Sequence, residues 1–258
     1  ETGGKLTSKN FQVPNLELIK GISTSRLSDR RRLLAGFDSS RRILDNRGFA
    51  TAQDSFTEQA YRMVTTTSVR DAFDLKLEDR ATRELYGNSE FGQGMLLARR
   101  LAERGVPFVT VGSGGWDNHG QKVCGFTLEQ GLKKRGPAFD QGVAALVTDL
   151  YRRGLDRKIL LVCMGEFGRT PKVNSEAGRD HWGAVMTVLV SGGGLQVGQV
   201  VGASDSKGGY PIAAPYGPNN VQAMIYRHLG IDSSLKFPDP AGRPRYVLEE
   251  RGLISELI

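Results

Sequence analysis

The 258-residue sequence contains 39% hydrophobic and 24% charged residues, which is enough apolar material for one large domain, or for one domain with a helical appendage. No run approaches the roughly 18 consecutive apolar residues that a membrane span requires, so we expect no membrane span. The formal net charge of +7 favours an anionic partner, although the basic residues are spread along the chain.

The N-terminal part, residues 1–90, is predicted to be a helical flank or cap. Apolar residues recur at helical spacing over residues 23–47, and Asp54 opens a second helical stretch. Because this part lacks a strand pattern and does not open with methionine, we expect further sequence upstream. The first stretch is rich in arginine, without a series of aromatic residues for base stacking, so we interpret these residues as a solvated helix face and expect no nucleic-acid partner: Arg26, Arg30, Arg31, Arg32, Arg41, Arg42 and Arg47.

Residues 91–258 are predicted to form an α/β core, in which helices alternate with apolar strands. The expected elements are a helix at 91–103, a strand at Pro107–Gly112, a helix ending at Arg153, a strand at Lys158–Met164, a strand at Ala184–Val190 and a helix near Val221–Leu229. Such alternation is typical of a sheet covered on both faces, so we expect a three-layer sandwich with a mainly parallel sheet. Cys163 lies within an expected strand, where a buried free thiol is common, and we predict no disulfide with Cys124.

The loops after the expected strands carry the candidate functional residues, since ligands of such sheets bind beyond the carboxyl ends of the strands. Asp117 and His119 are separated by one residue, which in extended backbone places both side chains on the same side, where they could bind one ion. The alternative is a polar turn with a capping aspartate and a merely exposed histidine. Asp205 lies in a turn-forming stretch, and we interpret it as a loop cap.

His181 strengthens the metal hypothesis, because it is one of only three histidines and also lies in a glycine-framed loop. Its neighbour Asp180 is either a further ligand or a residue that orients an imidazole. The third histidine, His228, lies near the C-terminal end of an expected helix, and we interpret it as structural.

Glu166 and Arg169 follow the apolar strand that ends near Met164, and we predict catalytic roles for both. Glu166 is a candidate metal ligand, and Arg169 is suited to gripping a phosphate or sulfate oxygen. An ordinary ion pair within the loop is the alternative for each. Carboxylates and imidazoles together favour a divalent ion such as zinc or manganese over calcium, which prefers oxygen ligands.

Four motifs together resemble a bacterial domain-of-unknown-function family placed in the alkaline phosphatase and sulfatase superfamily. The match runs from Phe11-Gln-Val-Pro14 to the Leu-Gly-Ile-Asp232 region. The motifs are Gly-Gly-Trp-Asp-x-His, Gly-Glu-Phe-Gly-Arg-Thr-Pro-Lys, Gly-Arg-Asp-His-Trp and Gly-Ala-Ser-Asp.

This resemblance implies an alkaline-phosphatase-like fold and a metal-dependent hydrolase of small anionic phosphate or sulfate esters. Asp117, His119 and His181 would hold one of two ions. Where relatives have Asp-His-Gly for the second ion, this chain has Glu166-Phe167-Gly168, so the carboxylate is kept and the imidazole is replaced. The early strand that carries the nucleophile in relatives has no counterpart in residues 1–90, so this core is expected to be partial. Relatives commonly carry a twin-arginine export signal, which implies the periplasm.

The replaced imidazole and the missing nucleophile strand motivate a rival hypothesis. In it the chain is a non-catalytic relative that keeps the fold and binds a glycan, a protein or a surface component.

Overall fold

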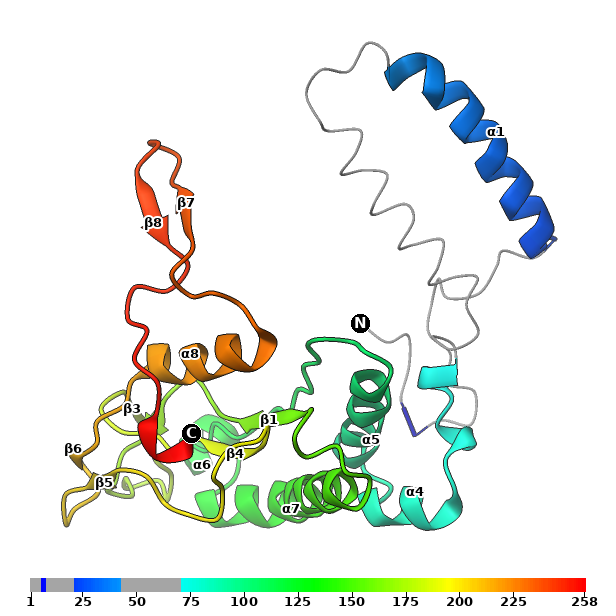
Figure 1. Ribbon diagram of the computed structural model, residues 1–258. Coiled ribbons are helices and arrows are strands. Elements are labelled where there is room, and N and C mark those ends of the chain that lie inside the picture. The colour runs from blue at the N-terminus through cyan, green and yellow to red at the C-terminus, as the bar shows by residue number, and fades with distance from the viewer. Residues whose placement is uncertain (1–5, 8–20, 43–70) are drawn as a thin grey trace. The chain divides into compact units, whose positions relative to one another are not determined.

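The computed structural model describes residues 6–7, 21–42 and 71–258 of the chain (Figure 1). It divides into two compact units, Glu1–Thr110 and Val111–Ile258. The helical stretch expected from Asp54 and the position of Arg47 lie outside the described residues. No helix among the described residues is long and apolar enough to cross a membrane.

Unit 1 is helical where the structure describes it. Its elements are α1 (Thr24–Arg42), η1 (Leu75–Leu77), α4 (Arg80–Tyr86) and α5 (Glu90–Glu103). Asp79 and Ser89 cap α4 and α5 by accepting hydrogen bonds from the backbone N–H of Thr82 and Gly92. Arg26, Arg30, Arg31 and Arg32 are exposed on α1, as expected for a solvated helix face.

An ion cluster is buried inside unit 1. The side chains of Arg99 and Arg100 are 0% and 2% exposed, and both pair with Glu78. Arg100 also donates to the backbone carbonyls of Asp71 and Ala72, which fastens α5 to the segment before η1. Buried charges are tolerated only when paired and hydrogen-bonded, so this cluster fixes how α5 packs.

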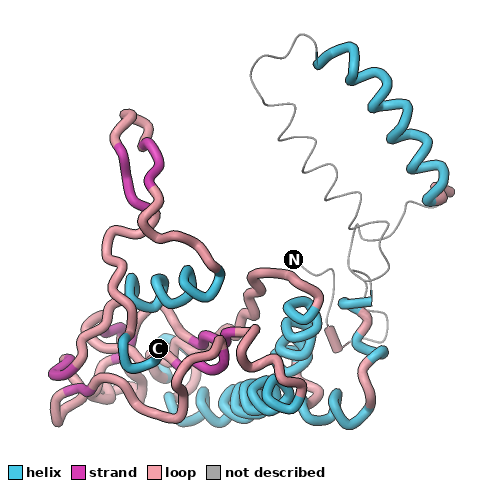
Figure 2. The backbone as a smooth tube through the Cα atoms, viewed as in Figure 1, coloured by secondary structure: helices cyan, strands magenta, loops and turns pink. Residues whose placement is uncertain are grey.

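Unit 2 combines helices with short strand pairs and many loops (Figure 2). The helices are α6 (Gln121–Cys124), α7 (Leu128–Arg152), α8 (Pro218–Leu229) and η2 (Ser255–Leu257). The strands are β1 (Leu160–Cys163), β2 (Gly168–Arg169), β3 (His181–Trp182), β4 (Leu189–Gly192), β5 (Ala203–Ser204), β6 (Pro211–Ala213), β7 (Lys236–Pro238) and β8 (Pro244–Tyr246). They form four antiparallel pairs, β1 with β4, β2 with β3, β5 with β6 and β7 with β8.

Helix termini and apolar contacts explain where the elements of unit 2 begin and pack. Thr127 and Gln130 form a capping box at the start of α7, and α8 has Pro218 in its first turn and a left-handed Gly230 after its end. The core contains Met224 of α8 together with Ile254 and Leu257 from the C-terminal segment. The end of the chain therefore packs back against α8 and against β4.

The strand expected at Lys158–Met164 is confirmed as β1, but two other expected strands are not. Residues 107–112 form no strand, and Phe108 is 63% exposed, which shows that a β-branched run need not be buried. Within 184–190 the pairing begins only at Leu189, and the carbonyl of Val185 lies against Gly168. The described strands form only antiparallel pairs. They neither confirm nor refute the three-layer sandwich with a mainly parallel sheet, which stays a prediction. The boundary between the two compact units falls at 110/111, so α5 belongs to unit 1, and the division into a flank at 1–90 and a core at 91–258 stays a prediction.

Candidate metal centre

The site is built on the β2–β3 hairpin of unit 2 and on the loop before α6. In the hairpin, Arg169 pairs with His181 and Gly168 pairs with Trp182. A Cβ atom at Gly168 would lie 1.8 Å from the carbonyl oxygen of Val185, so this glycine permits a close approach of backbone.

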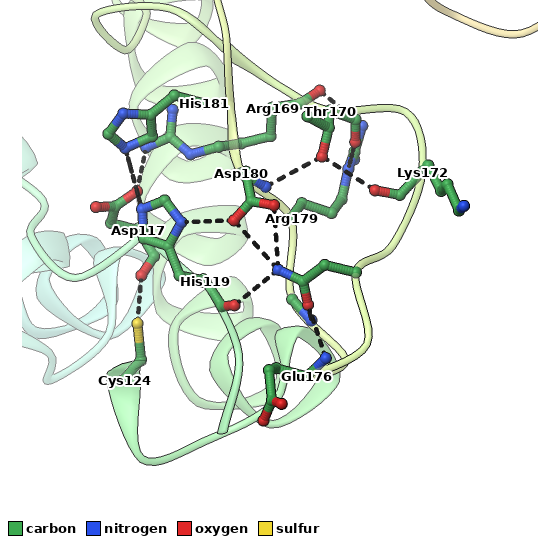
Figure 3. Close-up of polar contacts among 12 residues, drawn as sticks. Asp117, His119, Cys124, Arg169, Thr170, Lys172, Glu176, Arg179, Asp180 and His181 are labelled. Atoms are coloured by element: carbon green, nitrogen blue, oxygen red, sulfur yellow. Dashed lines mark hydrogen bonds and ion pairs between the residues drawn. The ribbon is translucent and has the colours of Figure 1, made fainter. Parts of the chain in front are cut away.

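Three side chains converge on one point from segments more than fifty residues apart in the sequence. Oδ1 of Asp117 lies 2.9 Å from Nε2 of His119 and 3.0 Å from Nε2 of His181. The two Nε2 atoms are 3.1 Å apart. Figure 3 shows the two imidazoles and the carboxylate turned toward one another. We call these three atoms the Asp-His-His triangle.

Asp180 lies outside this triangle, on the other edge of the His119 ring. Its Oδ1 is 3.1 Å from Nδ1 of His119, whereas Nε2 of the same ring faces Asp117 (Figure 3). In the neutral ring, a carboxylate in this position accepts a hydrogen bond from Nδ1, so that Nε2 presents its lone pair to the triangle. Of the two roles considered for Asp180, its position fits the orienting one.

Asn174 holds Asp180 and His119 together, and sequence reasoning missed it. Its amide nitrogen donates to Oδ1 of Asp180 at 3.1 Å and to the backbone carbonyl of His119 at 2.9 Å. Its amide oxygen accepts from the backbone N–H of Glu176 and of Gly178. The available signal was the Asn-x-x-x-Gly spacing of a side-chain-stabilised turn, which is weak without knowledge of what the turn approaches.

Two glycines allow the two site loops to touch. A Cβ atom at Gly178 would lie 2.1 Å from the carbonyl carbon of His119, and one at Gly120 would lie 2.5 Å from the backbone oxygen of Glu176. The backbone N–H of Arg179 also donates to the carbonyl of Asn118 at 2.9 Å. The loops that carry His119 and His181 are thus joined backbone to backbone, which fixes the triangle.

The guanidinium group of Arg169 forms ion pairs with two carboxylates. Its Nη2 donates to Oδ1 of Asp117 at 2.8 Å and to Oε1 of Glu166 at 3.0 Å. Its Nη1 donates to the backbone carbonyls of Phe167 and Gly168. Glu166 is linked to the triangle only through this guanidinium and is not part of it. The ion pair considered as an alternative for Glu166 and Arg169 is therefore present.

The electrostatics of the site favour a positive charge at the triangle. Partial burial raises the pKa of Asp117, but hydrogen bonds from His181 and His119 and the Arg169 charge outweigh it, so the pKa lies below its usual range. The hydrogen bond with Asp180 raises the pKa of His119, with a further contribution from Asp117. Accepting hydrogen bonds from His119 and then Asn174 lowers the pKa of Asp180. The two carboxylates therefore stay ionised and stabilise a cation, either a proton or a metal ion, beside His119.

The donor set and its spacing fit a divalent cation. A tetrahedral ion with bonds of about 2.0–2.1 Å separates its ligand atoms by about 3.3 Å. The observed edges of 2.9, 3.0 and 3.1 Å are close to this separation. His119 is 19% exposed, and Asp117 and His181 are about half exposed, so the centre is open to solvent on one side. An open position of this kind would admit water or a substrate.

The predictions for Asp205 and the cysteines are confirmed, and His228 lies in the helix expected for it. The carboxylate of Asp205 accepts hydrogen bonds from three backbone N–H groups of its own loop, which confirms it as a loop cap. His228 lies in the last turn of α8 and beside Gly193, and it is not part of the triangle. Both cysteines are free, and Cys124 donates from Sγ to the backbone carbonyl of Asp117.

Unit 2 is thus an assembly of helices and short strands in which loops build a candidate cation site. A family model described as "Protein of unknown function (DUF1501)" matches residues 2–258, and the chain belongs to this family. Neither a curated protein nor a solved structure matches the chain. The resemblance to a domain of unknown function is thereby confirmed.

Proposed function

We propose that the chain is a metal-dependent hydrolase of phosphate or sulfate esters, of the alkaline phosphatase and sulfatase type. The observation that carries the proposal is the Asp-His-His triangle, in which the His119 ring is oriented by Asp180. A histidine that binds a metal ion usually donates its other ring N–H to a carboxylate or a carbonyl, and Asp180 is placed to accept such a bond from His119. The resemblance extends the proposal to a three-layer fold and to export to the periplasm.

Asp117, His119 and His181 would hold one divalent ion, with zinc or manganese favoured by the mixed nitrogen and oxygen donors. When bound, such an ion polarises an ester oxygen or lowers the pKa of a water nucleophile. Glu166 would serve a second ion. Arg169 would hold the anionic ester group once the carboxylates that it now contacts are engaged as ligands.

A second candidate function is non-catalytic binding of a glycan, a protein or a surface component. The observation that favours it is Phe167, which replaces the imidazole of the second metal position in relatives. The Phe167 ring packs 4.6 Å from the His181 ring and 5.2 Å from the guanidinium carbon of Arg169. An apolar ring there reduces the ligand set available to a second ion.

The two candidates are separated by measuring metal content and turnover on the same full-length protein. Elemental analysis after dialysis against zinc or manganese would be followed by assays with aryl phosphates and aryl sulfates. The variants are His119→Ala and His181→Ala, with His228→Ala as the matched control, since it removes the only other histidine.

The hydrolase proposal expects about one or two ions per chain and turnover that is lost in the first two variants and kept in the third. Bound metal without turnover would favour the non-catalytic candidate. A protein that takes up no transition metal after reconstitution contradicts the hydrolase proposal.

A further inference from the structure

A second recess lies beside the β2–β3 hairpin and contains none of the triangle residues. It is a pocket of about 560 Å³ lined by Thr170, Pro171, Lys172, Trp182 and Lys207. Successive residues of a strand point to opposite faces, so Trp182 faces away from its neighbour His181. Lys172 likewise extends away from the Asp-His-His triangle in Figure 3. The pocket therefore occupies the reverse side of the hairpin.

The wall of this pocket is held in place by the Asp205 loop, which corresponds to the Gly-Ala-Ser-Asp motif. The carboxylate of Asp205 accepts from the backbone N–H of Lys207 at 3.0 Å, of Gly209 at 2.8 Å and of Tyr210 at 3.1 Å. The indole N–H of Trp182 donates to the carbonyl of Gly209 at 2.7 Å. These bonds fix the loop against β3, so the pocket is formed before any ligand arrives.

Two further contacts make this wall aromatic and rigid. The Trp182 and Tyr210 rings meet edge to face, with centroids 5.5 Å apart. Pro171 lies close to Gly208 of the same loop, at 3.9 Å from the position of a Cβ atom there. An indole and a proline ring form a rigid apolar surface, and the flat face of a ligand's ring can pack against it.

The charge of the pocket is positive. Lys172 and Lys207 both line the pocket and are exposed, and no ion pair of either ammonium group is found within the described part of the chain. The nearest acidic residue of the loop, Asp205, directs its carboxylate to backbone N–H groups, and its pKa is lowered first by the bond from Gly209. No residue that lines the pocket is acidic. An anion would find two ammonium partners there.

We propose that this pocket binds a sugar ring that carries a sulfate or phosphate group, with the ring against Trp182 and Pro171 and the anion between Lys172 and Lys207. Its volume falls within the range of sites for small ligands, about 300–1,000 Å³. The pocket goes beyond the proposed hydrolase site, because it lies on the other face of the hairpin and needs no metal ion.

The test uses the indole of Trp182 as the reporter. The chain has two tryptophans, so Trp116→Phe leaves Trp182 alone in the fluorescence spectrum. EDTA-treated protein would be titrated with glucose 6-sulfate, glucose 6-phosphate, glucose and inorganic sulfate, and calorimetry would check each Kd. We expect both charged sugars to quench and shift the Trp182 emission at lower concentration than glucose or sulfate alone, and their ratio identifies the preferred oxyanion.

A second experiment removes the positive charges of the pocket. Lys172→Gln combined with Lys207→Gln should weaken binding of the charged sugars by roughly tenfold or more, since each charged hydrogen bond is lost. Lys133→Gln on α7 is the matched control, because it removes one exposed ammonium elsewhere, and it should leave the Kd unchanged.

His119→Ala should also leave this binding unchanged, which separates the pocket from the metal centre. Binding that is lost in His119→Ala, that persists in the Lys172 and Lys207 double variant, or that does not distinguish glucose from its charged esters overturns the proposal. So does an absence of any change in Trp182 emission.

Discussion

Oδ1 of Asp180 lies 3.1 Å from Nδ1 of His119, while Nε2 of the same ring lies 2.9 Å from Asp117. The two carboxylates thus hold opposite edges of one imidazole. The hydrogen bond at Nδ1 selects the tautomer whose Nε2 carries a lone pair, which is the form that binds a metal ion.

Asp180→Ala should weaken zinc binding by about 10- to 100-fold, because the His119 ring loses the partner that sets its tautomer and orientation. Asp180→Asn keeps an oxygen acceptor and should weaken it less. Affinities would be measured by competition with a chromophoric chelator. Asp140→Ala, on the exposed part of α7, is the control. Equal affinity for the Asp180→Ala and control proteins would show that Asp180 does not act through His119.

Gly178→Ala should disrupt the metal centre by steric overlap. The added methyl group would lie about 2 Å from the His119 carbonyl group, so the two site loops must separate. We expect a loss of about 1–3 kcal/mol in stability and a larger loss in zinc affinity.

Gly112→Ala is the matched control for this change, since this glycine is exposed, has no positive φ, and has nothing within 4 Å of an added Cβ atom. It should change the melting temperature and the zinc affinity little, because surface substitutions that create no overlap usually change stability by less than about 0.5 kcal/mol. Thermal melts of both variants with and without zinc check the pair. A Gly178→Ala protein that binds zinc like the parent would refute the close-approach argument.

The sequence was informative about the site residues and much less so about how they meet. Asp117, His119 and His181 could be found because histidine is rare in this chain and lies beside glycine-rich loops. The sequence could not predict whether Asp180 belongs to the Asp-His-His triangle or lies outside it, because this depends on which edge of the His119 ring the carboxylate faces. Asn174 was missed since its bond to the carbonyl of His119 joins segments that only the fold brings together, while its bonds from Glu176 and Gly178 are those of an ordinary turn.

The fold was predicted unevenly for a related reason. The apolar runs predicted β1 correctly, but the same pattern at residues 107–112 predicted a strand that is not formed. Strand formation requires a hydrogen-bonding partner, and a local pattern does not specify one. The capping residues of α4, α5 and α7 are local signals, and these helices form where such signals occur.

Glu78→Gln should destabilise the protein by about 3 kcal/mol at pH 7, because it leaves two buried guanidinium groups without their shared carboxylate. Burial raises the pKa of Glu78, but the hydrogen bonds and charges of Arg99 and Arg100 outweigh it and lower the pKa below its usual range. The stabilisation is therefore complete above the unfolded pKa of about 4.3 and is lost as the pH falls through the lower folded value.

Urea unfolding of the parent and of Glu78→Gln at pH 7, 5, 4 and 3 measures this dependence. The difference in unfolding free energy should be constant at pH 7 and 5 and should shrink below about pH 4. Glu129→Gln removes a carboxylate from an exposed helical pair with Lys133 and should change little at any pH. A Glu78→Gln difference that grows as the pH falls would contradict the assigned direction.

Arg169→Met should separate metal binding from anion binding. Nη2 of Arg169 contacts both Asp117 and Glu166, so removing its charge leaves two carboxylates free to attract a cation, and zinc affinity should stay the same or rise. Binding of inorganic phosphate to the zinc-loaded protein should instead weaken by about tenfold or more, because the bidentate donor is gone. Arg169→Lys keeps the charge without the planar fork and should give an intermediate phosphate affinity. Zinc affinity that collapses while phosphate binding per bound zinc is unchanged would mean that Arg169 only holds the loop together, and the role of Arg169 in gripping the ester would have to be abandoned.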